Sequence, residues 1–290
     1  MSASFESLVC QHLLPDGRRL AFTDIGPAEA TDILVCLPGL LETRQTFDPV
    51  LQARPAGLRC ISIDHCGRGQ SDPLPDDRGY SMARYLADLQ DFLEQHIPAS
   101  SRLHLLGTSM GGILAFYLVA AQRPPVHSLL LNDIGLELHW TALMGLASQM
   151  RSATPLMSPA LLAQSLGVSP GVLADVQKPA HFDLPYRRGL KGMDFSSQLA
   201  AYTGPIRLLR GQASVVCLPA QVRHLKKLHP GAQVLEVAGA SHPVPFDAAA
   251  CDFLLAGLCS GAQRQDAAAA PGPAGPSFWR WLQGKFSQRT

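Results

Sequence analysis

Short apolar runs recur along the chain and are separated by stretches with the spacing of amphipathic helices. Residues 32–37 (DILVCL) are almost continuously apolar, which is typical of a central strand covered on both faces. Similar runs lie at residues 59–63, 102–107, 127–132, 205–210 and 232–237. Helical patterns fall at residues 43–54, 80–96, 109–122, 218–229 and 246–259. Repeated strand–helix units predict an α/β fold with a mostly parallel sheet and helices on both of its faces.

Two regions depart from this rhythm. Residues 8–14 and 18–24 flank the turn signal Pro15-Asp16-Gly17, so they predict a β-hairpin. Residues 136–204 are rich in Leu, Met, Ala, Ser and Pro and contain no clear strand. We expect a helical cap there, over the sheet edge where α/β proteins bind ligands. A set of surface helices that never contacts a ligand is the alternative.

These patterns also predict the domain organisation. Residues 1–135 and 205–260 form the two parts of an α/β core, and residues 136–204 form the cap between them. Residues 261–276 have the Ala, Pro and Gly composition of a flexible linker. Residues 277–290 form a short aromatic and basic segment, which either docks to a protein partner or membrane surface or packs on its own domain.

Composition narrows the class of protein. The chain has 290 residues, of which 47% are hydrophobic and 16% are charged, so it can bury a large core. A net charge of +1 gives no reason to expect a nucleic-acid partner. No apolar run reaches the roughly 18 residues that span a bilayer, and the N-terminus lacks the pattern of a secretory signal. The seven cysteines lack metal or redox spacing, so we expect reduced thiols in a cytoplasmic protein.

The strongest chemical signal is Gly107-Thr108-Ser109-Met110-Gly111. It follows an apolar run, LHLL, and opens a helical one, ILAFYLVAA. A strand that enters a helix through Gly-x-Ser-x-Gly is a nucleophile elbow, in which the tight turn exposes the Ser hydroxyl above the helix N-terminus. The two glycines are needed because side chains at their positions would collide. The alternative is a glycine-rich turn with an incidental serine.

In this order of elements the sequence resembles the α/β-hydrolase fold family, from about residue 8 to residue 258. The resemblance implies that Leu37-Pro38-Gly39-Leu40 is the oxyanion loop, with Pro38 in place of the usual His. It further implies that the N–H groups of Leu40 and Met110 bind the oxyanion. Residues 61–72 (ISIDHCGRGQSD) match a family segment to which we assign a structural role.

The resemblance also indicates a general base. His242 lies in a Gly-x-x-His loop, from Gly239 onward, after the last expected strand, where the family places its catalytic histidine. A serine hydroxyl needs such a base because it is a poor nucleophile near neutral pH.

The acid of a Ser–His–acid triad is missing from its usual place. After Gly211 the chain has Ser214 and Val215 where an Asp or Glu is expected. One explanation is that Asp133, at the end of the preceding strand, supplies the acid and keeps the order Ser, acid, His. The other is that the triad is incomplete, which can lower kcat by roughly four orders of magnitude.

We therefore expect a serine hydrolase that cleaves a small or medium apolar carboxylic ester through an acyl-enzyme, with no metal and no organic cofactor. Thioesters, lactones and some carbon–carbon bonds are cleaved by the same machinery. The alternative is a hydrolase-like scaffold that binds a ligand or protein with weak or no turnover. An epoxide or haloalkane hydrolase is not expected, because those related enzymes carry Asp where this chain has Ser109.

Overall fold

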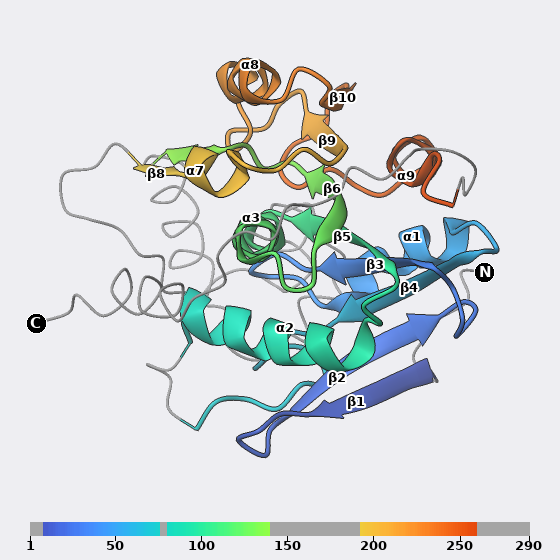
Figure 1. Ribbon diagram of the computed structural model, residues 1–290. Helices are drawn as coiled ribbons and strands as arrows, with labels where there is room; N and C mark the ends of the chain where they lie inside the picture. The colour runs from blue at the N-terminus through green and yellow to red at the C-terminus, as the bar shows by residue number, and fades with distance from the viewer. Residues whose placement is uncertain (1–7, 76–79, 140–191, 260–290) are drawn as a thin grey trace, which may run out of the picture.

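The structure is a computed structural model that describes residues 8–75, 80–139 and 192–259. Eight strands form one sheet in the order β1-β2-β4-β3-β5-β6-β9-β10 (Figure 1). They are β1 (Val9–Leu13), β2 (Arg19–Ile25), β3 (Asp32–Leu37), β4 (Leu58–Ile63), β5 (Arg102–Thr108), β6 (Val126–Asn132), β9 (Ile206–Gly211) and β10 (Gln233–Val237). The pairs β1·β2 and β2·β4 are antiparallel, and the other neighbours are parallel. The mostly parallel sheet and the N-terminal hairpin are thus confirmed.

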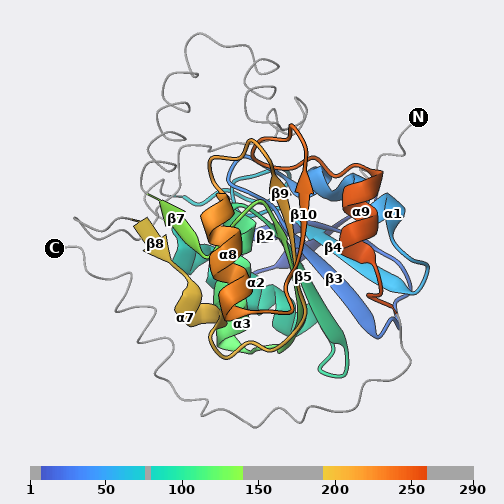
Figure 2. The same ribbon diagram turned by 90° about the horizontal axis from the view of Figure 1, so that it is seen from above.

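Helices cover both faces of the sheet, as Figure 2 shows from above. On one face lie α2 (Met82–His96), α3 (Met110–Ala121) and α8 (Pro219–Leu228). On the other lie α1 (Asp48–Ala53), which follows the 3₁₀ turn η2 (Arg44–Phe47), and α9 (Ala248–Leu255). Each face has its own apolar core, and every side chain of β3 is buried between the two. This burial explains the continuous apolar run at residues 32–37.

Helix α3 is an interior helix. Ten of its residues, Met110–Val119, are buried, so it has no polar face. It packs against β5, α2 and the short helix α7 (Ser196–Leu199). A Cβ added to Gly112 would lie 2.3 Å from the Ile134 side chain, so this glycine allows the helix to approach the chain after β6 closely. The helix N-terminus, next to Ser109, is therefore fixed by packing.

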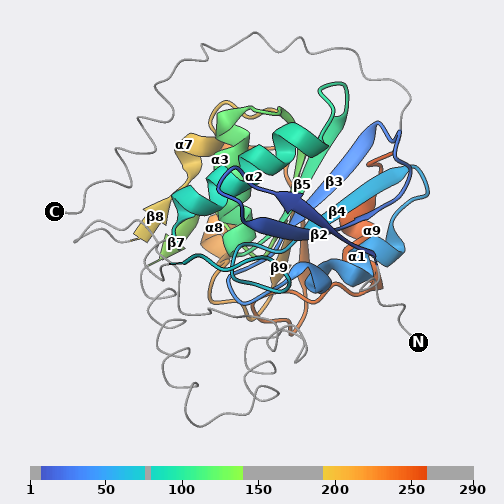
Figure 3. The same ribbon diagram turned by 90° about the horizontal axis from the view of Figure 1, so that it is seen from below.

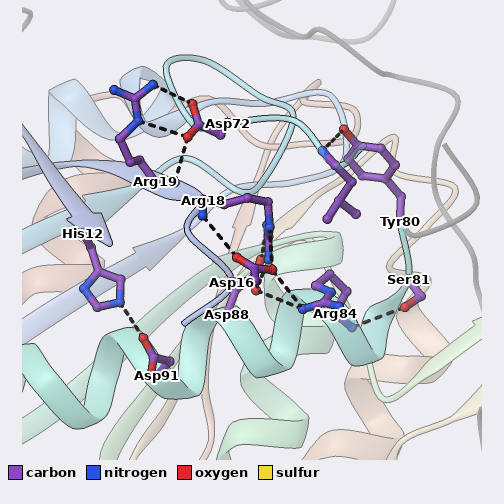
Figure 4. Close-up of polar contacts among 11 residues, drawn as sticks. His12, Asp16, Arg18, Arg19, Asp72, Tyr80, Ser81, Arg84, Asp88 and Asp91 are labelled. Carbon is purple, nitrogen blue, oxygen red and sulfur yellow. Dashed lines mark hydrogen bonds and ion pairs between the residues drawn. The ribbon is translucent and has the colours of Figure 1, made fainter. Parts of the chain in front are cut away.

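The N-terminal hairpin forms one edge of the sheet, nearest the viewer in Figure 3. Polar side chains connect the hairpin to α2 through hydrogen bonds (Figure 4). Arg18 makes two hydrogen bonds to Asp88, at 2.8 and 2.6 Å, and His12 Nε2 lies 2.7 Å from Asp91. Arg18 and Asp88 are both buried, so this pair holds the hairpin in a fixed position against α2.

The expected cap is described only at its ends. Two short strands, β7 (Glu137–His139) and β8 (Gly192–Asp194), pair antiparallel, so the chain leaves and re-enters the core at neighbouring points. The expectation of a helical cap with no clear strand is wrong at these ends, because strands of three residues carry no periodic signal. The rest of the cap, residues 140–191, lies outside the described residues, as do the predicted linker and terminal segment.

Two further observations concern the described part of the chain. All seven cysteines lie in it, and none forms a disulfide. Across residues 8–75, 80–139 and 192–259, no helix is both long enough and apolar enough to cross a membrane.

Candidate active site

Ser109 sits on a sharp turn between β5 and α3. Its φ is +49° and its ψ is −111°, a strained conformation for a residue with a side chain. The turn brings Gly107 and Gly111 together: a Cβ on Gly107 would lie 2.5 Å from the Gly111 carbonyl, and one on Gly111 would lie 1.9 Å from the Leu37 oxygen. Both glycines are therefore required by space, and the geometry is that of a nucleophile elbow.

His242 reaches this serine from the loop between β10 and α9. Its Nε2 lies 2.9 Å from Ser109 Oγ. The loop is fixed from the end of β6, where Asn132 donates to the Val244 carbonyl at 2.9 Å and accepts from the Val244 N–H at 3.2 Å. Asn132 is fully buried, so it holds the histidine loop against the sheet edge.

Asp133 completes a hydrogen-bonded chain with Ser109 and His242. It follows β6 directly and is fully buried, and its φ of +54° turns the chain sharply. Its Oδ2 lies 2.8 Å from His242 Nδ1. Because a carboxylate can only accept, Nδ1 carries the proton and Nε2 is left to accept from the Ser109 hydroxyl.

Ser214 occupies the position where the sequence lacks an acid. Its hydroxyl donates to Asp133 Oδ2 at 2.6 Å, and its oxygen accepts the N–H groups of Val216 and Cys217, both at 3.1 Å. The Gly211 N–H donates to Asp133 Oδ1 at 2.9 Å. The strand end that usually carries the acid thus supports the carboxylate of Asp133 instead. Of the two explanations for the missing acid, the geometry favours the one that uses Asp133.

The two expected oxyanion donors lie on either side of the elbow. Met110 is the first residue of α3, so its N–H has no acceptor within the helix. Leu40 lies in the loop after β3, which packs so closely on the elbow that Gly111 has no room for a side chain. Among the described residues, no hydrogen bond uses the Leu40 N–H. The positive end of α3 also points at this place, and a helix N-terminus favours negative charge.

The family segment at residues 61–72 has the contacts of a structural element. The Asp64 carboxylate is fully buried and accepts the N–H groups of Arg44 at 2.7 Å and Gln70 at 3.1 Å. Gly69 has a φ of +52°, and a Cβ there would lie 2.2 Å from Asp64 Oδ2. The segment therefore shapes the loop beside the oxyanion loop, and it supplies no group to the Ser109 hydroxyl.

Sequence reasoning missed Glu42, which is 3% exposed beside the oxyanion loop. Its Oε2 accepts the Gly39 N–H at 2.6 Å, and its Oε1 has no hydrogen-bond partner. Burial raises the pKa of this carboxyl to about 7, although the Gly39 N–H and the charge of His242 act to lower it. The only sequence signal was a charged residue within an apolar loop, three positions after Gly39.

No group of three or more His, Cys, Asp or Glu side chains in the described residues is arranged to hold a metal ion.

Sequence relatives that are named as hydrolases or as hydrolase-like match part of the chain. The chain is 35% identical over 136 residues to 3-hydroxybutyrate-oligomer hydrolase from Cupriavidus necator. This match covers 47% of the chain and 46% of that protein. The chain is also 32% identical over 108 residues to serine hydrolase-like protein from Danio rerio. This match covers 37% of the chain and 32% of that protein. The matches thus span less than half the length of these curated relatives.

Solved structures match over most of the chain. A hydrolase structure from Rickettsia typhi has a TM-score of 0.71 at 19% identity and covers 88% of this chain and 97% of its own. An α/β hydrolase from Novosphingobium aromaticivorans also has a TM-score of 0.71, at 20% identity, and covers 87% and 97%. The model of the alpha/beta hydrolase fold family matches residues 32–170. Together with the shared architecture, this match shows that the chain has the α/β-hydrolase fold.

Proposed function

We propose that the protein is a serine hydrolase that cleaves carboxylic esters through an acyl-enzyme. The observation that carries the proposal is the continuous chain from Ser109 Oγ to His242 Nε2 at 2.9 Å and from His242 Nδ1 to Asp133 Oδ2 at 2.8 Å. Ser109 and His242 are both partly exposed, so a substrate can approach them. A hydroxyl, a base and an orienting carboxylate in this order suit nucleophilic acyl transfer.

In the first half-reaction the Ser109 oxygen attacks the ester carbonyl and its proton passes to His242 Nε2. The carbonyl oxygen becomes negative and is stabilised by the N–H groups of Leu40 and Met110. Asp133 stabilises the imidazolium that forms. When the tetrahedral intermediate collapses, the imidazolium gives its proton to the leaving alcohol, and the acyl group stays on Ser109.

In the second half-reaction water replaces the alcohol. His242 takes a proton from the water as the oxygen attacks the acyl-enzyme, and the same N–H groups hold the second oxyanion. The proton then returns to Ser109 Oγ as the carboxylic acid leaves. The balance of the two steps is ester plus water to acid plus alcohol, with no electron transfer.

A panel of p-nitrophenyl esters with acyl chains from acetyl to octanoyl tests the proposal. We expect turnover by the wild type and none above background for Ser109→Ala. Because a sequence relative is named for hydrolysis of 3-hydroxybutyrate oligomers, the panel includes the 3-hydroxybutyrate dimer and trimer, and a thioester as a further acyl donor. Turnover that survives in Ser109→Ala would contradict the mechanism.

The alternative is a scaffold that binds without turnover. Two features of the sequence support it: the absence of an acid after Gly211 and the terminal segment, residues 277–290, which lies outside the described residues. The contact between Asp133 and His242 weakens the first support. A wild-type protein that is inactive on the whole panel, yet binds a panel ester with saturation, would favour the scaffold.

A further inference from the structure

The oxyanion loop is held by side chains on both sides of the peptide group that carries the Leu40 N–H. That peptide joins Gly39 to Leu40. The preceding peptide, Pro38–Gly39, is bound at its N–H by Glu42 Oε2 at 2.6 Å and at its carbonyl by His65 Nε2 at 3.2 Å. The following peptide is bound at the Leu40 carbonyl by Arg68 Nε at 2.8 Å.

Glu42 acts on this loop twice. Besides the side-chain contact, its backbone N–H donates to the Gly39 carbonyl at 3.3 Å, which is the carbonyl of the Gly39–Leu40 peptide itself. In a trans peptide the N–H points opposite to the carbonyl, so a bond that fixes the Gly39 carbonyl also sets the direction of the Leu40 N–H. Glu42 therefore constrains both the peptide that carries the donor and the one before it.

The side chain of Glu42 remains buried at a cost. It is 3% exposed, and Oε1 makes no hydrogen bond in the described part of the chain. A buried acceptor without a partner destabilises the fold, and an apolar residue of similar size would avoid this cost. A contact that is kept despite such a cost calls for a functional explanation.

We propose that Glu42 is a positioning residue that aims the Leu40 N–H at the oxyanion by holding the Gly39 N–H. The inference rests on the proposed function, because it assigns a task within the same acyl transfer. This role requires a side chain that is long enough to reach the Gly39 N–H and that ends in an oxygen able to accept it. A proton on Oε1 leaves Oε2 free to accept, so the contact persists whether or not the carboxyl is ionised.

Three substitutions separate reach from charge. Glu42→Gln keeps the length and an accepting oxygen but removes the charge. Glu42→Asp keeps the charge but is one methylene too short to reach the Gly39 N–H. Glu42→Leu removes both. The matched control is Gln90→Leu, since Gln90 on α2 is also buried and its Oε1 also lacks a hydrogen-bond partner.

We expect kcat for an ester to fall about 10- to 100-fold in Glu42→Asp and Glu42→Leu with KM within about 3-fold, because the lost contact acts on the transition state. Glu42→Gln and Gln90→Leu stay within about 3-fold of the wild type. The inhibition constant of a boronic acid, whose adduct with Ser109 places an oxygen in the oxyanion site, rises in parallel with the loss of kcat. A structural role alone would change the melting temperature without this parallel.

The outcomes that overturn the proposal are distinct from failure of the proposed function. If Glu42→Asp keeps wild-type kcat while Glu42→Gln loses it, charge rather than reach is what matters, and the proposal is wrong. It is also wrong if all three variants keep wild-type kcat and boronic acid affinity. If the wild type neither hydrolyses the ester nor reacts with a fluorophosphonate at Ser109, the proposed function itself fails.

Discussion

The structure contains two hydrogen-bonded chains of Ser, His and Asp side chains with similar distances, at opposite ends of the central strands. In the first, Ser109, His242 and Asp133 are linked at 2.9 and 2.8 Å, next to the carboxyl ends of β5 and β6. In the second, His104 Nδ1 lies 2.6 Å from Ser128 Oγ and His104 Nε2 lies 3.1 Å from Asp32 Oδ1. We call the second one the buried chain.

The serine and histidine of the buried chain are not exposed as Ser109 and His242 are. Ser128 lies within β6 and is 3% exposed, and His104 is 1% exposed. Burial lowers the pKa of His104 to about 4, although Asp32 acts to raise it, so this imidazole is a weak base near neutral pH. Asp32 also makes two hydrogen bonds to Arg102, at 2.6 Å each.

The comparison shows that hydrogen-bond distances alone do not make a nucleophile. Ser109 differs from Ser128 in its strained backbone, its exposure and the helix N-terminus that follows it. In the proposed mechanism, these features place the attacking oxygen beside N–H groups that hold the oxyanion. The buried chain instead satisfies polar groups at the start of three strands, which is a contribution to stability.

The largest expected difference is in the two serines. Ser109→Ala should lower kcat/KM for an ester by a factor on the order of 10⁴ to 10⁶, because the nucleophile is lost. Ser128→Ala should leave kcat/KM within about 2-fold and lower the free energy of unfolding by about 1–2 kcal/mol. Steady-state kinetics and urea unfolding measure both. Equal losses of kcat/KM in the two variants would contradict the different roles assigned to Ser109 and Ser128.

The two carboxylates should differ next most strongly. Asp133→Asn should lower kcat by roughly 10³- to 10⁴-fold with the fold intact, because the amide favours the wrong imidazole tautomer. Asp32→Asn should leave kcat nearly unchanged and instead lower the melting temperature, because Arg102 loses its charged partner. If Asp133→Asn turned over esters at the wild-type rate, Asp133 would have no part in the mechanism.

The buried chain should respond to acid. The folded-state pKa of His104, about 4, lies below its ordinary value of 6.5, so its contribution to stability is complete above pH 6.5 and is lost as the pH falls through 4. The shift corresponds to about 3 kcal/mol at most. We expect His104→Gln to lose less unfolding free energy than the wild type between pH 7.5 and pH 4. Parallel pH profiles of the two proteins would show that His104 is not held neutral by burial.

A smaller effect should come from returning the acid to its usual place. Because the Ser214 hydroxyl lies 2.6 Å from Asp133 Oδ2, an Asp at position 214 would place its carboxylate near His242 Nδ1. We expect Ser214→Asp to recover about 10- to 100-fold of the kcat lost in Asp133→Asn. Ser214→Ala alone should cost only a few-fold, since Gly211 still holds Asp133. The recovery is measured by comparing kcat on one ester for Asp133→Asn and for the double variant Asp133→Asn/Ser214→Asp. If the double variant is no faster, position 214 is not where an acid can serve His242.

The fold was largely predictable because its signals are local. The run at residues 32–37 predicted β3, and the glycines at 107 and 111 predicted the turn that holds Ser109. The acid was not decided by sequence, because whether Asp133 meets His242 depends on the loop that Asn132 holds from 112 positions away. Glu42 was missed for the same reason, since a charged residue in a loop gives no sign that it folds back onto Gly39.

Labelling with a fluorophosphonate, followed by mass spectrometry of the labelled peptide, tests most directly whether this site activates a serine. We predict a label on Ser109 in the wild type, none on Ser128, and a loss of labelling in His242→Ala, whose base is gone. Folded wild-type protein that stays unlabelled at Ser109, or that is labelled equally well without His242, would contradict the proposed mechanism.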